Sequence, residues 1–518
     1  MDQKTYFDKV YGCWLGKNVG GAMGMPFEGH AGFVNGPVKM PDSAVANDDL
    51  DLQLVWLDVL RRKGADITAD DLAETWGRNI VYAWDEYGVA IANLKLGLKP
   101  PYSGIRGNWF KDCMGAPIRS EIWACIAPGR PEIAGWYAYQ DASVDHWDEG
   151  VYGEIFLATV ESAAFSVSPV VIPADGKRES ISDHHLHSLI NTGLSFLPGS
   201  SRVRQGVELA VLLYGDGRSL RESRDRIVEE FGHHNFTDAV QNIAFIALGL
   251  LYGQGDFVKT IESAIRCGCD GDCTGSSTGA IMGILSGRQS VLSRLDAEIS
   301  DEIIMGDGIT GLKAPATLAE LTEQTVAIGE QVLAGRDRPV IAQPFVLPPV
   351  RAEEVPALRL PCCVSAPVAT EVLADTEDRF VRQGLNGSRR MNLDSRSLDL
   401  AGFFGPEPDA NVFVSTHFRL PDDRKLKVFP ATTDGVKLWI DGDLVLSHRG
   451  RGKFLPAPHR PGSPLVELKM KKGWHRVLLE LARSGNTNEF AWIVTDEKNH
   501  YVTDIEYRDT PDNEGGAS

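Results

Sequence analysis

The chain has 518 residues, of which 43% are hydrophobic and 24% are charged, and its net charge is −19. These proportions are typical of a folded globular protein, and the length predicts about three ordinary domains or one large domain with a smaller one. The acidic balance argues against a nucleic-acid backbone or an anionic membrane surface as the partner, because both require clustered Lys and Arg.

The first residues of the chain and its cysteines indicate the cellular compartment in which we expect the protein. Residues 1–16 contain Asp2 and Asp8 and no long apolar run, so we expect no secretory signal. No stretch reaches the roughly 18 apolar residues that span a membrane. Cys267, Cys269 and Cys273 lack the paired spacing of zinc sites, which favours buried reduced thiols. We therefore predict a cytoplasmic protein.

Residues 1–335 are predicted to form one large all-α domain. Apolar residues recur there at three- and four-residue steps, which is typical of amphipathic helices. The segments with this period are 50–62, 70–84, 153–165, 203–214, 219–230, 238–252, 256–266 and 278–285. Thr68 and Asp238 are predicted N-caps, and Gly-rich turns are expected to join the helices.

A change in composition predicts a second domain. Seven prolines fall within residues 336–375, and proline at this density cannot continue a helix, so we predict a linker. Residues 376–510 then alternate apolar and polar positions, most clearly at 412–416, 436–440 and 476–481. We predict a smaller antiparallel β-sandwich over 376–510 and a disordered tail over 511–518.

Two acidic clusters stand at predicted helix starts, Asn47 to Asp49 before one helix and Asp270 with Asp272 before another. Asp and Asn are preferred N-caps that suit the helix dipole, so capping alone explains either cluster taken singly. The excess of acids favours a second interpretation, because one cap needs one side chain and adjacent carboxylates repel each other without a cation. If the clusters converge in space, their oxygen ligands would favour Mg²⁺, Mn²⁺ or Ca²⁺.

Four segments, in this order, resemble the motifs of the ADP-ribosylglycohydrolase family. Residues 12–29 resemble its Gly-rich opening, 47–49 its Thr-Asp-Asp motif, 141–153 its middle segment, and 269–273 its Gly-Asp-x-Asp-Thr motif. Where the family typically has Asp, Thr and Thr, this chain has Gly21, Asn47 and Cys273.

The resemblance implies an all-α fold whose cleft holds two divalent cations, Mg²⁺ or Mn²⁺. The metal ligands that it implies are Asn47, Asp48, Asp49, Asp270, Asp272 and Cys273. Glu28 and Asp49 would be the catalytic residues, with Glu28 positioning or deprotonating the attacking water. Residues 114–119 are the nearest match to the Gly-rich substrate loop of the family. Gly115 and Arg119, together with His146 of the middle segment, would therefore bind the substrate.

The prediction is thus a multidomain α and β protein, in which a large all-α ADP-ribosylglycohydrolase-like domain precedes a smaller antiparallel β-sandwich. Its predicted function is metal-dependent hydrolysis of an N- or O-glycosidic bond at the anomeric carbon of a ribosyl, ADP-ribosyl or related sugar. The partner would be a small-molecule glycoside or ADP-ribosyl substrate. The alternative is a catalytically silent protein that binds or senses a sugar nucleotide.

Overall fold

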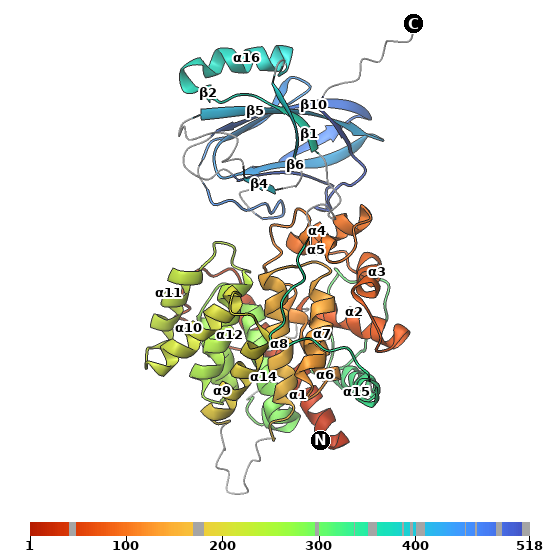
Figure 1. Cartoon of the computed structure of the whole chain (residues 1–518), viewed down its shortest axis with the longest axis vertical. Helices are drawn as coiled ribbons and strands as arrows, with labels where there is room; N and C mark the ends of the chain where they lie inside the picture. The colour runs from red at the N-terminus through yellow and green to blue at the C-terminus, as the bar shows by residue number, and fades with distance from the viewer. Residues whose placement is uncertain are drawn as a thin grey trace. The chain divides into compact units, whose positions relative to one another are not determined.

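The computed structural model describes residues 1–40, 48–168, 181–295, 300–335, 337–350, 360–385, 388–393, 397–399, 410–450, 452–460, 464–482 and 489–509. The chain divides into two compact units (Figure 1). Unit 1 comprises Met1–Tyr82, Lys99–Ile105 and Phe110–Pro349. Unit 2 comprises Ala83–Leu98, Arg106–Trp109 and Val350–Ser518.

Unit 1 is helical, as predicted. Its α-helices are α1 (Gln3–Gly24), α2 (Asp48–Lys63), α3 (Ala69–Asn79), α5 (Tyr102–Ile105), α6 (Glu121–Ile126), α7 (Pro131–Ala142), α8 (Glu149–Ala164), α9 (Asp183–Phe196), α10 (Arg202–Gly215), α11 (Leu220–Phe231), α12 (Ala239–Gly253), α13 (Phe257–Arg266), α14 (Gly271–Leu292) and α15 (Leu318–Ala334). Two short 3-10 helices, η1 (Met25–Phe27) and η2 (Pro117–Arg119), join them. Among the described residues, no helix is both long and apolar enough to cross a membrane.

The predicted caps of two helices are confirmed. The side chain of Thr68 accepts a hydrogen bond from the backbone N–H of Asp71, whose carboxylate in turn accepts from the N–H of Thr68. The side chain of Asp238 caps α12 by accepting a hydrogen bond from the backbone N–H of Gln241. The predicted extension of α3 to residue 84 is wrong. Ile80 is already extended and forms a β-bridge with Ile309, which ends the helix at Asn79.

Unit 2 contains the antiparallel sandwich. Its strands are β1 (Leu360–Val364), β2 (Val368–Ala369), β3 (Arg389–Leu393), β4 (Ser397–Asp399), β5 (Ala410–Leu420), β6 (Arg424–Thr432), β7 (Val436–Ile440), β8 (Asp443–His448), β9 (Val466–Met470), β10 (Gly473–Ala482), β11 (Glu489–Thr495) and β12 (Glu506–Arg508). One sheet has the order β3-β1-β5-β10-β7-β8, with β2 and β12 also paired to β5. The other sheet has the order β4-β11-β6-β9. The predicted period of two is confirmed, because Val412 and Val414 of β5 join the core cluster shared by the two sheets while Phe413 belongs to a different cluster.

A helix packs on each outer face of the sandwich. Phe413 and Trp439 of the larger sheet pack against α16 (Leu373–Gln383) through Phe380. On the smaller sheet, one cluster joins residues of β6 and β11 to Val89 and Ala92 of α4 (Asp85–Lys95). The helix α4 therefore belongs to unit 2, although the chain enters and leaves it from unit 1.

The predicted division into residues 1–335, 336–375, 376–510 and 511–518 stays a proposal. The two units differ from it in that residues 83–98 and 106–109 belong to unit 2, and unit 1 continues to Pro349. The predicted tail over 511–518 lies outside the described residues, as does Asn47.

Candidate active site

A seam of eight glycines brings the two acidic motifs together. It joins α1 to α14 in antiparallel fashion and pairs Gly12 with Gly283, Gly16 with Gly279, Gly20 with Gly275 and Gly24 with Gly271. A Cβ atom added to any of the four glycines of α1 would lie 1.9–2.3 Å from the carbonyl oxygen of its partner, closer than real Cβ atoms approach. This glycine seam therefore holds the end of α1 against the start of α14.

The glycine seam corrects one expectation. Gly-rich segments of the chain were expected to form turns between the helices. Residues 3–24 instead form one continuous helix, most of whose residues from Tyr6 onward are buried. The glycines serve close packing between helices, and the helix was not predicted because glycine is a poor helix former.

Just beyond the glycine seam, backbone hydrogen bonds join the two turns that carry the acids. The N–H of Gly29 donates to the carbonyl of Cys269 at 2.9 Å, and the N–H of Cys269 donates to the carbonyl of His30 at 2.7 Å. Cys269 adopts a left-handed conformation with φ of 60°. These bonds fix the turn that contains Glu28 beside the turn that leads into Asp270.

The start of α2 contributes to the same place. One donor atom from each of Asp49, Asp272 and Cys273 lies within 4.8 Å of the other two, and all three residues are buried. This group, which we name the donor cluster, could hold a metal ion. Asp48 begins α2, but its side chain lies outside the described part of the structure, as does Asn47.

Asp270 lies near the donor cluster, and the charge of Asp49 affects its ionisation. Burial raises the pKa of Asp270 to about 7, and the charges of Glu28 and Asp49 add to the rise. Asp270 occupies the N-cap position of α14, yet its side chain makes no capping hydrogen bond, so capping does not account for it. Within the described residues no group donates a hydrogen bond to its Oδ2 atom. A buried carboxylate of this kind suits a bound cation.

Asp51, two residues after Asp49 on α2, is held separately from the donor cluster. Its Oδ2 accepts hydrogen bonds from the hydroxyl of Tyr82 at 2.8 Å and from the N–H of Gly306 at 2.9 Å. Burial raises the pKa of Asp51 to about 6. It thus ties α2 to the segment around residue 306.

A buried polar network supports the donor cluster from within unit 1. The side-chain amide of Gln53 donates to the carbonyl of Asp49 at 3.0 Å and to Glu121 at 2.8 Å. Lys17 of α1 pairs with the other carboxylate oxygen of Glu121 at 2.9 Å. Burial lowers the pKa of Lys17, but the charges of Glu121 and Asp49 outweigh it, so the net pKa is raised. This network was not predicted, although Lys17 is the only charged residue between positions 10 and 27.

The three residues expected to bind substrate form a second buried network. The guanidinium of Arg119 donates to Asp141 at 2.8 Å, to Asp145 at 2.5 Å and to the carbonyl of Gly115 at 2.7 Å. Nε2 of His146 accepts from a backbone N–H, which leaves the proton on Nδ1, 2.9 Å from Asp145. Burial lowers the pKa of His146. Arg119 and His146 have no exposed surface, so the structure gives them a bracing role, and their role in substrate binding stays a prediction.

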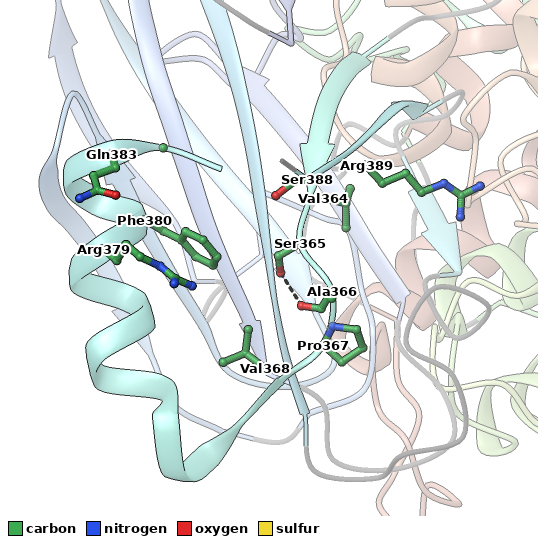
Figure 2. Close-up of a pocket in the computed structure, with 11 residues that line it drawn as sticks. Val364, Ser365, Ala366, Pro367, Val368, Arg379, Phe380, Gln383, Ser388 and Arg389 are labelled. Atoms are coloured by element: carbon green, nitrogen blue, oxygen red, sulfur yellow. Dashed lines mark hydrogen bonds between the residues drawn. The ribbon is translucent and has the colours of Figure 1, made fainter. Parts of the chain in front are cut away.

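Unit 2 has a hollow of about 710 Å³ between α16 and the segment from Val364 to Val368, which joins β1 to β2 (Figure 2). Arg379 and Phe380 reach toward this segment from α16 (Figure 2). The hollow contains none of the residues predicted from the sequence to act in catalysis.

The fold and the site together define a helical domain with a buried acidic cluster at the junction of three helix ends. The ADP-ribosylglycohydrolase family model matches residues 2–327, and the chain belongs to this family. Membership supports a glycohydrolase-like function and agrees with the resemblance found in the sequence. No curated protein matches the chain.

Solved structures show weaker similarity. An ADP-ribosylglycohydrolase-related protein complex is 18% identical, with a TM-score of 0.40, over 63% of this chain and 99% of that chain. A beta-glucosidase from Kluyveromyces marxianus is 12% identical over 29% of this chain and 15% of its own, with a TM-score of 0.19. A PA14 sugar-binding domain from an RTX adhesin is 14% identical over 29% of this chain and 96% of its own, with a TM-score of 0.21.

Proposed function

We propose that this protein is a metal-dependent hydrolase that cleaves an N- or O-glycosidic bond at the anomeric carbon of a ribosyl, ADP-ribosyl or related sugar. One observation carries the proposal: Asp49 and Asp272, far apart in the sequence, share one buried donor cluster with Cys273. Carboxylates gathered in this way need a cation, and a bound cation can orient a sugar diol. Membership of the family supports the same reaction class.

The proposed ligands of two divalent cations are Asn47, Asp48, Asp49, Asp270, Asp272 and Cys273, and Mg²⁺ or Mn²⁺ are the ions that the resemblance implies. When bound, such cations supply Lewis-acid stabilisation and orient the hydroxyls of the sugar. Glu28 is the proposed general base. It is exposed, unlike the buried acids beside it, so its carboxylate can meet a water and a substrate that arrive from solvent. Asp49 is proposed to act with it by fixing the site from α2.

Gly115, Arg119 and His146 remain proposed substrate-side residues. Because Arg119 and His146 are buried, their contribution would come through the backbone of residues 114–119, which the two side chains brace. Asp141 and Asp145 would support that role as the acceptors of Arg119.

Glu28→Gln tests the proposal. Loss of a general base typically costs roughly 100-fold or more, so we expect kcat on the best substrate to fall by at least that factor while bound metal is unchanged. The measurement is turnover of a panel of ribosides, nucleosides and ADP-ribosyl compounds, with metal content determined on the same samples. Glu323→Gln, at an exposed glutamate of α15, is the matched control and should retain activity.

The panel also decides between the enzyme and the sensor. A wild-type protein that binds sugar nucleotides tightly and turns over no member of the panel would favour the catalytically silent alternative. Full activity of Glu28→Gln would remove Glu28 from the mechanism.

A further inference from the structure

A sulfur atom takes part in the donor cluster. Cys273 contributes its Sγ, and Asp49 and Asp272 each contribute a carboxylate oxygen, all within 4.8 Å of one another. The exposed fractions are 0% for Asp49, 6% for Asp272 and 8% for Cys273, so water cannot easily replace the protein donors. The described donor set is therefore two oxygens and one sulfur.

Asp270 gives an independent indication that the place is built for a ligand. It is 2% exposed, and its Oδ2 receives no hydrogen bond from the described residues. Its carboxylate lies in hydrogen-bonding range of Asp272 and Cys273, and the charge of Asp49 acts on it. Asp270 is thus a further oxygen donor beside the donor cluster. It stands at the start of α14, but its side chain does not cap that helix.

The chemistry of the donors discriminates between cations. Mg²⁺ requires oxygen ligands in near-ideal octahedral geometry and keeps several waters, which a thiolate in a buried site opposes. Zn²⁺ accepts thiolate, carboxylate and imidazole in tetrahedral sites, and Fe²⁺ and Co²⁺ are similarly borderline in softness. One thiolate with carboxylates around it matches these ions better than it matches Mg²⁺.

We propose that the donor cluster binds a borderline divalent ion, of the class of Zn²⁺, Fe²⁺ or Co²⁺, in preference to Mg²⁺, with the Sγ of Cys273 as a direct ligand. On binding, the thiol releases its proton to the buffer as the metal–sulfur bond forms. The inference rests on the metal dependence in the proposed function and names the class of the ion. It does not depend on which sugar is cleaved.

Cobalt provides the test, because a thiolate bound to Co²⁺ gives a near-ultraviolet charge-transfer absorption that oxygen ligands do not give. The full-length metal-free protein is titrated with Co²⁺, and we expect this absorption in the wild type and its loss in Cys273→Thr. Cys269→Ser is the matched control. Cys269 lies in the same turn, is 6% exposed and is outside the donor cluster, so this variant should keep the absorption.

Competition titrations measure the preference. Outer-shell partners alone are typically worth about tenfold in metal affinity, so loss of a ligand should weaken Zn²⁺ binding in Cys273→Thr by at least that factor. Mg²⁺ binding should stay equal or become tighter. Absence of the absorption in the wild type, or equal Zn²⁺ affinities in the wild type and Cys273→Thr, would overturn the inference.

The two proposals can fail separately. A protein that shows the cobalt–sulfur absorption but hydrolyses no glycoside keeps the metal inference and loses the proposed function. A protein that hydrolyses ribosides with Mg²⁺ and shows no such absorption keeps the proposed function and loses the metal inference.

Discussion

Among single residues, Asp270 is a buried acid beside the donor cluster whose negative charge a bound cation would stabilise. Its pKa of about 7 in the folded protein lies above the ordinary value of 3.8. Between these two values the folded state binds more protons than the unfolded state, so the metal-free protein loses stability as pH rises from about 4 to about 7. Metal binding requires the ionised carboxylate and therefore strengthens over the same rise.

The direction of this pH dependence predicts how Asp270→Asn changes the stability of the metal-free protein. Replacing the buried acid removes a charge that costs stability above pH 7 when no cation is bound, so the melting temperature of the metal-free protein should rise. The gain should be larger at pH 8 than at pH 5, because the carboxyl of Asp270 is already protonated in the folded wild type at pH 5. Thermal melts with a chelator at both pH values measure it. Asp216→Asn, at an exposed position, should show no such difference. An equal rise in melting temperature at pH 5 and pH 8 would contradict the raised pKa of Asp270.

The acids of the site could be predicted from the sequence, because an excess of carboxylates at a helix start can be recognised from the order of the residues alone. Asp49, Asp270 and Asp272 were identified in this way, and the structure brings them together with Cys273. The support beneath them could not be predicted. Gln53 acts through its contact with Glu121, which is distant in the chain, and nothing local marks such a pair.

At the scale of elements, the glycine seam makes the site depend on how closely two helices approach. A Cβ atom at Gly20 would lie 1.9 Å from the carbonyl oxygen of Gly275, so Gly20→Ala must push α1 away from α14. We expect a loss of stability of about 2 kcal/mol or more, as for an overpacked core, with weaker metal binding. Chemical denaturation and metal titration measure the two effects.

Gly77→Ala is the matched control for the glycine seam. Gly77 lies within α3 with open space where a Cβ would stand, and alanine there should stabilise the protein by roughly 0.5–1 kcal/mol through its better helix propensity. If Gly20→Ala behaves like Gly77→Ala, the glycine seam does not determine the approach of the two helices.

The elements themselves were predicted to different degrees. Helices with a regular apolar period, such as α10 and α13, were found close to their observed bounds, and β7 was found over its full length. The helix α1 was not, because its apolar residues surround it on all sides and leave no periodic face. The end of α3 was missed because a bridge to a distant residue, Ile309, sets it.

For the whole molecule, the membership of α4 in unit 2 predicts the effect of truncation. Val89 is 2% exposed and Ala92 is 1% exposed, and their partners include Phe429 and Ile493 of the sandwich. Asp85, at the start of the helix, pairs with Arg460 at 2.6 Å. A protein that ends at Pro349 would leave this apolar face without its partners, so we expect it to self-associate.

Size-exclusion chromatography and binding of a hydrophobic dye measure this effect. Adding Val89→Ser and Ala92→Ser to the truncated protein should restore much of its solubility, because these changes remove the exposed apolar face. A truncated protein that is monomeric without these changes would show that α4 does not need the sandwich.

The path of the chain also limits how proteins of this architecture can be recombined. Residues 83–98 and 106–109 interrupt the matched region 2–327, yet they belong to the unit that holds the C-terminal sandwich. A gene fusion that appended or exchanged the sandwich at a single junction would therefore deliver an incomplete module. Chimaeras that graft the sandwich onto another helical body will therefore need both pieces.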